Sequence, residues 1–222
     1  MPEIGVLLAG CGAQDGSEIH ESVITLLALD RAGVDVRIMA PDMDQFHVVN
    51  HFNGDTIGSS RNILVEASRI ARGNIISVDK VSGDELDALI FPGGTGMAKN
   101  IFNYGMIGSD CTIISDVERI TREIIESDKP LGAICIAPVM VAKILQNMGR
   151  QGKVTGGFNE QINTDIQTMG IKIEKVGARD IVVDEKNKIV STPAYVEASS
   201  INEVAEGIDN LVAKVIEMIQ SK

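Results

Sequence analysis

The sequence predicts an α/β fold: a doubly wound, mostly parallel sheet sandwiched by helices, with a late β-hairpin. Strand-like apolar runs alternate with helix-period segments over most of the 222 residues. Hydrophobic residues make up 44% of the chain, which is enough to bury one well-packed core. Because no repeat, low-complexity tract or linker divides the chain, we expect a single domain over residues 1–222.

The first half opens with a strand over residues 4–9 and a glycine-rich turn. A helix follows from near Gly16 to Gly33, in which Asp15 and Glu18 have the spacing of a capping box. Its periodic apolar residues include Ile19, Val23, Leu26 and Leu27. The next predicted elements are a strand over 34–39, a long irregular excursion over 41–60, a helix over 61–71 and a strand over 87–91.

In the second half the pattern continues as helix, strand and helix before it changes after Gly149. Apolar runs on either side of the charged segment 184–188 predict the hairpin. The elements expected here are a helix over 111–126, a strand over 131–134, a helix over 136–147, the hairpin over 181–190 and an amphipathic helix over 197–219.

Composition excludes several classes of partner. The chain carries 20 Lys and Arg against 31 Asp and Glu, a net charge of −11, without a basic run, so we expect neither nucleic acid nor a membrane surface as a partner. No stretch approaches the roughly 20 apolar residues that span a bilayer. The N-terminus lacks a basic leader, and the three cysteines lack a Cys-x-x-Cys spacing. We therefore expect a cytoplasmic protein.

We also expect no cofactor and no metal. His47 and His51 are spaced i,i+4 but lack a nearby acidic residue that would complete a metal-site pattern. Gly10-x-Gly12 follows the first strand, as in dinucleotide-binding motifs, but the third glycine, Gly16, stands one position late.

Residues 131–138 are the most informative stretch for chemistry. They predict a buried strand that turns sharply into a helix with Cys135 at the bend, where a cysteine can act as a nucleophile. Ala133 and Ala137 are small, as such an elbow requires. The alternative is that Cys135 is a small apolar residue in a core strand.

Glu21 is the candidate carboxyl partner of Cys135. Ligands of doubly wound sheets bind beyond the carboxyl ends of the strands, and Glu21 follows the first strand's turn without a capping duty. A protonated Glu21 would donate a hydrogen bond to the thiolate. We expect this bond, together with the positive end of the helix after the elbow, to lower the pKa of the thiol by about two units, or about 2.7 kcal/mol. The alternative is an ordinary solvated glutamate.

The glycine turn after the strand over 87–91 offers main-chain donors. We expect the N–H groups of Gly94 and Ile136 to form an oxyanion hole, although the glycines of an ordinary turn would look the same. All three histidines, His20, His47 and His51, precede Cys135. Without a positioned imidazole, proton transfer to an amine leaving group is hard to arrange.

Several motifs are informative together: residues 10–12 with 15–21, 91–94 with 98–100, 133–138, and 180–184 with 191–195. In these motifs the chain resembles the ElbB family of isoprenoid biosynthesis proteins with an amidotransferase-like domain. That family resembles the class I glutamine amidotransferase-like and PfpI-like superfamily, so the resemblance implies a flavodoxin-like fold. It also implies an elbow cysteine at Cys135, an oxyanion site at Gly94 and Ile136, and a first-helix glutamate at Glu21, ten residues before Arg31-Ala-Gly.

The resemblance implies a cofactor-independent glyoxalase-type activity that converts glyoxal-like dicarbonyls to hydroxy acids, with a loose link to isoprenoid metabolism. The expected partner is a small-molecule carbonyl substrate. Whether the chain forms a homodimer is left open. The first turn and the matching segments supply further candidates for lining the site: Cys11, Glu18, His20, Asn100 and Tyr195.

The sequence departs from the superfamily where amidotransferases offer a histidine and an acid. Gly157 and the segment from Tyr195 to Glu197 stand there, so glutaminase or protease activity is disfavoured. Three hypotheses remain: the glyoxalase, a non-catalytic or redox-responsive regulator that keeps the elbow, and a glutaminase domain that requires a synthase partner.

Overall fold

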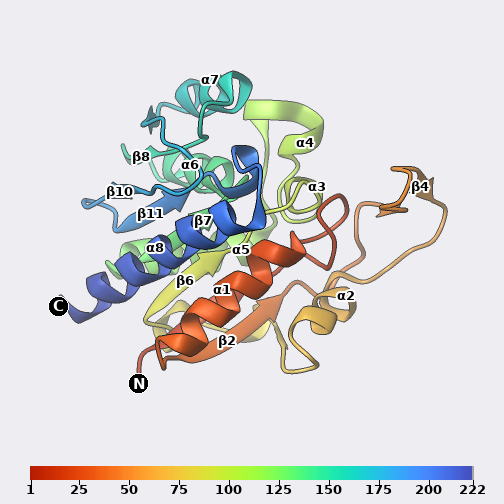
Figure 1. The fold of residues 1–222 in the computed structure, drawn as a ribbon, viewed down its shortest axis with the longest axis horizontal. Coiled ribbons are helices and arrows are strands. Elements are labelled where there is room, and N and C mark those ends of the chain that lie inside the picture. Colours follow the sequence, from red (N-terminus) through yellow and green to blue (C-terminus); the bar gives the residue numbers. More distant parts are fainter. Residues whose placement is uncertain (222) are drawn as a thin grey trace.

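A seven-stranded sheet forms the centre of the computed structural model, which describes residues 1–221 (Figure 1). Neighbouring strands run parallel except for β10 and β11, which form the predicted late hairpin. The predicted α/β fold is confirmed. From one edge to the other, the strands are β10 (Val182–Asp184), β11 (Ile189–Thr192), β7 (Leu131–Ile134), β6 (Ala88–Phe91), β1 (Glu3–Leu7), β2 (Asp35–Ala40) and β5 (Ile76–Ser77).

Helices cover both faces of the sheet. One apolar cluster joins the sheet to α1, α2 and α8, and a second joins it to α3, α5, α6 and α7. In Figure 1, α1 and α8 lie side by side in front of the sheet. The helices of the described residues are α1 (Ile19–Arg31), α2 (Ile63–Ile70), α3 (Met97–Asn100), α4 (Tyr104–Ile107), α5 (Ser115–Glu126), α6 (Ala137–Asn147), α7 (Glu160–Thr168) and α8 (Ile201–Gln220).

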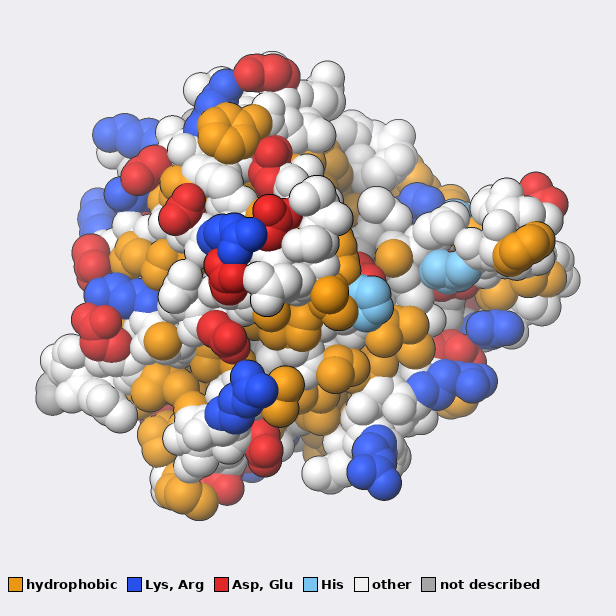
Figure 2. Space-filling view, viewed as in Figure 1, with side chains coloured by type: hydrophobic (Ala, Val, Ile, Leu, Met, Phe, Trp, Pro, Cys, Tyr) orange, Lys and Arg blue, Asp and Glu red, His pale blue; other side chains and the backbone are white. Residues whose placement is uncertain are grey.

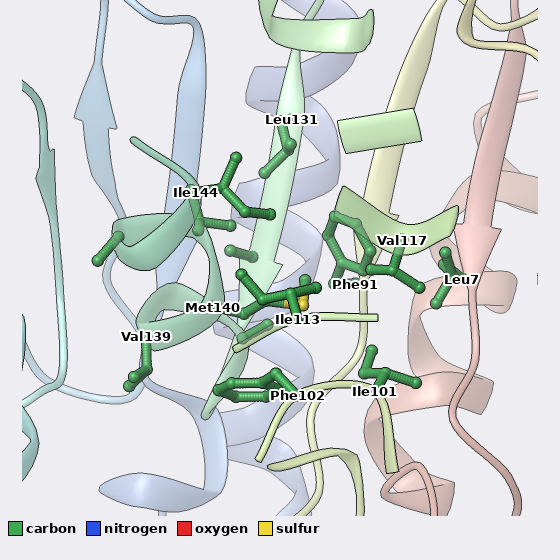
Figure 3. Packing of buried hydrophobic residues seen from close by; sticks show 14 of the residues in the cluster. Leu7, Phe91, Ile101, Phe102, Ile113, Val117, Leu131, Val139, Met140 and Ile144 are labelled. Carbon is green, nitrogen blue, oxygen red and sulfur yellow. The ribbon is translucent and has the colours of Figure 1, made fainter. Parts of the chain in front are cut away.

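Alternation along the central strands builds the two clusters. Leu7 and Phe91 point into the cluster under α5 and α6, whereas Val6 and Ile90 point into the cluster under α1 and α8. All four are at most 1% exposed, and each such side chain contributes about 1.5–3 kcal/mol through its burial. Figure 3 shows the cluster under α5 and α6 around Phe91.

The start of α1 differs from the prediction. The helix begins at Ile19, and its N-cap is Glu18, whose side chain accepts from the Glu21 N–H at 2.7 Å. The predicted capping box of Asp15 and Glu18 is wrong, because Asp15 accepts instead from the N–H of Val49 at 2.8 Å. The turn before the helix closes on itself through main-chain hydrogen bonds.

The apolar periodicity of α1 does not mark its buried face. Ile19, Val23 and Leu27 are 43–48% exposed, and Figure 2 shows hydrophobic side chains on the surface that α1 forms. The buried residues of the helix are Glu21, Ser22, Thr25, Ala28 and Leu29. A carboxyl group therefore lies on the inner face, where the pattern predicts aliphatic side chains.

Several short elements lie outside the predictions. Strands of two residues, such as β5, carry too little periodicity to be recognised. In the predicted excursion over 41–60, β3 and β4 form a small antiparallel hairpin that projects from the body (Figure 1). The remaining elements are β3 (Val48–Val49), β4 (Thr56–Ile57), β8 (Lys153–Val154), β9 (Lys172–Ile173) and the 3-10 turns η1 (Val78–Lys80), η2 (Gly83–Glu85), η3 (Gly108–Asp110) and η4 (Ala194–Val196). Within residues 1–221, no helix has the length and hydropathy to cross a bilayer.

Candidate functional site

Cys135 lies between β7 and α6, at the strand–turn–helix bend that the sequence predicts. Its φ of +63° lies in the left-handed region, which a non-glycine residue adopts only when its surroundings enforce it. The main-chain N–H of Cys135 donates to the Thr192 carbonyl of β11 at 2.9 Å, so the sheet itself holds the bend. This is the geometry of a nucleophile elbow.

Glu21 contacts the elbow from α1. Its side chain is 0% exposed, and its carboxyl is hydrogen-bonded to the Cys135 thiol. Oε2 accepts from the Gly93 N–H at 2.9 Å, and Oε1 accepts from the Tyr195 N–H at 3.3 Å. The alternative of a solvated surface glutamate is therefore wrong.

Gly93 makes the close approach of the sulfur and the carboxyl sterically feasible. A Cβ at this position would lie 2.5 Å from Cys135 Cβ and 2.9 Å from Glu21 Oε2. Its amide also binds the carboxyl, so Gly93 has two roles in the site that sequence reasoning missed. The Gly93-Gly94 pair indicated that a glycine is needed in this turn, but the spacing of residues in the sequence does not show which of the two faces the carboxyl.

The two ionisable groups have shifted pKa values. Burial, and then the nearby Glu18, raise the pKa of Glu21 to about 7. Burial and the negative charge of Glu21 raise the pKa of Cys135 well above its ordinary value. The expected lowering of the thiol pKa is wrong for the free protein, because desolvation and the neighbouring charge outweigh the hydrogen bonds. Above pH 7, the site holds a thiol that donates to a carboxylate.

The predicted main-chain donors reach the sulfur. The N–H groups of Gly94 and Ile136 both hydrogen-bond to Cys135, and both oppose the rise of its pKa. Gly94 adopts a φ of +117°, which favours glycine, and a Cβ there would lie 2.6 Å from the Glu18 nitrogen. Two amides that converge on a nucleophile can also bind an oxyanion formed on the atom it attacks.

Three of the other lining candidates adjoin the site. Glu18 caps α1 and contributes to the raised pKa of Glu21. Tyr195 donates its main-chain N–H to the Glu21 carboxyl, and its hydroxyl lies 2.7 Å from His20 Nδ1.

The remaining two candidates have other surroundings. Burial raises the pKa of the Cys11 thiol, and the charges that act on it are those of Glu66, Arg69, Asp15 and Arg61 rather than those of the elbow. The Asn100 amide donates to the carbonyls of Ala9 and Asp15 and accepts from the Phe46 N–H, so it fixes the first turn and the excursion. Both are candidates that the structure does not bring to Cys135.

The two histidines of the excursion also contact the first turn. His51 Nε2 accepts from the Gln14 N–H at 3.2 Å, and His47 Nε2 lies 3.3 Å from the Gln14 carbonyl oxygen. Over residues 1–221, no three His, Cys, Asp or Glu side chains group as metal ligands would. Independence of metals and cofactors stays a prediction.

Gly157, where the resemblance leads us to expect a histidine in amidotransferases, packs closely against the Glu197 side chain. Gly157 has a φ of +62°, and a Cβ there would lie 2.4 Å from Glu197 Cγ. The Glu197 carboxylate accepts from the Phe158 N–H at 2.6 Å. Glu197 is therefore an acid near the expected place, and its carboxylate binds the main chain.

The fold and the elbow define an α/β protein of the class I glutamine amidotransferase-like type. Within this class, the chain belongs to the DJ-1/PfpI family, whose family model matches residues 11–200.

Named relatives agree with this assignment. The human protein called glutamine amidotransferase-like class 1 domain-containing protein 3, mitochondrial, is 40% identical over 97% of this chain and 82% of its own length. The ES1 protein, mitochondrial, of Danio rerio is 31% identical over 97% of this chain and 85% of its own.

Solved structures show the same fold. An isoprenoid biosynthesis protein with an amidotransferase-like domain from Ehrlichia chaffeensis superposes with a TM-score of 0.91 at 36% identity, over 98% of this chain and 99% of that one. The Rapid Encystment Protein 24 KDa of Francisella tularensis, with a TM-score of 0.67 at 14% identity over 99% of each chain, shares the fold.

Proposed function

We propose that the chain is a cofactor-independent glyoxalase-type enzyme that converts glyoxal-like dicarbonyls to hydroxy acids through a hemithioacetal on Cys135. The observation that carries the proposal is the hydrogen-bonded thiol and carboxyl of Cys135 and Glu21, with no cation beside them in the described site. A buried carboxyl with a pKa of about 7 is suited to move protons near neutral pH.

The first step forms a bond between sulfur and carbon. The Cys135 sulfur attacks one carbonyl carbon while its proton passes to the Glu21 carboxylate. The N–H groups of Gly94 and Ile136 hold the resulting oxyanion, which then takes the proton back from Glu21. The thiol does not have to be ionised before the attack, because the base lies in contact with it.

The second step is an internal redox exchange. Glu21 removes the hydrogen of the sulfur-bound carbon as a proton, and the electron pair moves toward the second carbonyl oxygen. Glu21 returns the proton to the second carbon, and the hydroxyl proton of the sulfur-bound carbon passes to the second oxygen, which gives a hydroxyacyl thioester. Water hydrolyses the thioester and restores the thiol. One carbon is oxidised and its neighbour is reduced, so glyoxal plus water gives glycolic acid without an external oxidant.

The missing histidine favours this chemistry over glutaminase or protease activity, because no amine has to leave. The raised thiol pKa weighs against a redox sensor, because oxidation follows thiolate character.

We extend the proposal to membership of the ElbB-type proteins with a link to isoprenoid metabolism, which the name of the Ehrlichia relative supports. A cytoplasmic location stays a prediction, and the human and zebrafish relatives are named mitochondrial.

The test is glycolate formation from glyoxal by the purified protein, followed by NMR. Cys135→Ser should lower turnover by more than about 1,000-fold with the fold intact, since it removes the nucleophile. The matched control is Cys111→Ser, which alters a buried cysteine outside the site. Turnover that is unchanged in Cys135→Ser would contradict the proposal, and ammonia release from glutamine would support the glutaminase instead.

A further inference from the structure

Tyr195 has two contacts that tie it to the site. It lies in η4, just after β11, the strand that pairs with the elbow strand β7. Its main-chain N–H donates to Glu21 Oε1 at 3.3 Å, and its hydroxyl lies 2.7 Å from His20 Nδ1. Because His20 directly precedes Glu21, the pair joins the first turn of α1 to the segment that follows β11.

Exposure to solvent increases from the carboxyl of Glu21 to Tyr195 and then to His20. Glu21 is fully buried, Tyr195 is partly buried and His20 is exposed. In the tautomer of His20 that carries its proton on Nδ1, the imidazole donates to the Tyr195 hydroxyl, which keeps its own proton free to donate to a third group. Burial and the nearby Glu18 and Glu21 raise the pKa of Tyr195, so the hydroxyl stays protonated at neutral pH.

The proposed reaction needs a donor that the two main-chain amides do not supply. A 1,2-dicarbonyl has two oxygens, and the amides of Gly94 and Ile136 converge at the sulfur, where only the first oxygen forms. When the C–H proton is removed, negative charge develops on the second oxygen. A positioned donor for such a charge contributes about 100-fold or more to a rate.

We propose that the Tyr195 hydroxyl, held by His20, donates a hydrogen bond to the second carbonyl oxygen and so directs the site to 1,2-dicarbonyls rather than simple aldehydes. The hydroxyl proton stays on Tyr195, while the C–H proton moves to Glu21 and then to the second carbon. This inference rests on the proposed function. It adds a substrate-contacting residue, Tyr195, and a positioning residue, His20.

The test is Tyr195→Phe, which keeps the ring and the main-chain N–H to Glu21 and removes only the hydroxyl. With glyoxal, kcat should fall about 100-fold while KM changes little, since the donor acts mainly on the developing charge. The isotope effect on kcat with deuterated glyoxal should rise, because C–H removal becomes slower relative to the other steps. A structural role alone would not raise it.

The chain offers a matched control in its other tyrosine. Tyr104 donates its hydroxyl to Asp165 at 2.7 Å, and Tyr104→Phe should keep kcat within two-fold. His20→Ala should lower kcat about 10-fold, and His20→Gln, whose amide can still donate to the hydroxyl, should recover part of the loss.

The outcomes separate this role from the proposed function. If the wild-type protein forms no glycolate, the proposed function and this role both fail. If the wild-type protein turns over and Tyr195→Phe retains kcat within two-fold with an unchanged isotope effect, the role of Tyr195 is overturned and the Cys135 mechanism stands.

Discussion

Two buried glutamates lie beside two cysteines near the strand ends of this sheet, and their surroundings differ. Glu66 is near Cys11 and is 5% exposed, with Arg61 and Arg69 at 3.3 and 3.1 Å from its carboxylate. Glu21 is 0% exposed and has amides and the Cys135 thiol as partners instead of a cation. A buried carboxylate paired with cations stabilises structure, whereas one without them is able to exchange protons near pH 7.

The close packing at the elbow gives the largest expected effect on stability. In Gly93→Ala, the new Cβ would lie 2.5 Å from Cys135 Cβ and 2.8 Å from the Ile134 carbonyl oxygen. The free energy of unfolding should fall by about 3 kcal/mol, and misplacement of the sulfur should lower kcat by about 100-fold. Thermal unfolding and glyoxal kinetics measure both.

The matched control is Gly58→Ala, where a Cβ meets nothing within 4 Å. It should change neither quantity measurably. If Gly93→Ala behaves like Gly58→Ala, the elbow is looser than the structure indicates.

The uncompensated charge of Glu21 predicts a pH-dependent stability. Its carboxyl has a pKa of about 7 in the folded chain against an ordinary value of 4.5. The folded state therefore binds the proton more tightly, and this group's contribution to stability falls as pH rises from about 4.5 to 7. Glu21→Gln removes that dependence, so the stability of the variant relative to wild type should increase by about 2 kcal/mol between pH 5 and pH 8.

Denaturant titrations of both proteins at the two pH values measure this difference. An equal difference at pH 5 and pH 8 would show that Glu21 ionises with an ordinary pKa.

The other glutamate should respond in the opposite way. Glu66→Gln removes the ion pairs to Arg61 and Arg69, whose guanidinium groups are partly solvated and can bind water instead. We expect a loss of about 1 kcal/mol in the free energy of unfolding and turnover within two-fold of wild type. A 10-fold loss of turnover would mean that the Glu66 region belongs to the site.

The smallest effect is expected from Cys11→Ser. Cys11 lies among charges away from the elbow, and burial raises the pKa of its thiol. Turnover with glyoxal should change by less than two-fold in steady-state assays. A loss comparable to that of Cys135→Ser would make Cys11 a second functional thiol.

The same comparison shows what could be predicted from the sequence. The strands at the centre of the sheet were predictable because each is a short apolar run bounded by glycine or proline. The elbow was predictable because Cys135 stands between such a run and Pro138. These signals are local in the chain.

The surroundings of Glu21 were not predictable in this way. Its partners Gly93 and Tyr195 are 72 and 174 residues away, and the apolar periodicity of α1 favoured the opposite face. The direction of the Cys135 pKa depends on that burial, so the sequence-based expectation had the wrong sign. Likewise, the start of α1 depends on Asp15 bonding to Val49, which is 34 residues away.

The most direct test of the account is the titration of Glu21 itself. Carbon-13 NMR of the glutamate carboxyls, with Glu21→Gln to assign the resonance, gives its ionisation in the free protein. The account predicts an apparent pKa of about 7, because burial beside the Cys135 thiol without a cation disfavours the charge. A Glu21 carboxyl that titrates near its ordinary 4.5 would contradict the claim that this buried pair moves protons at neutral pH.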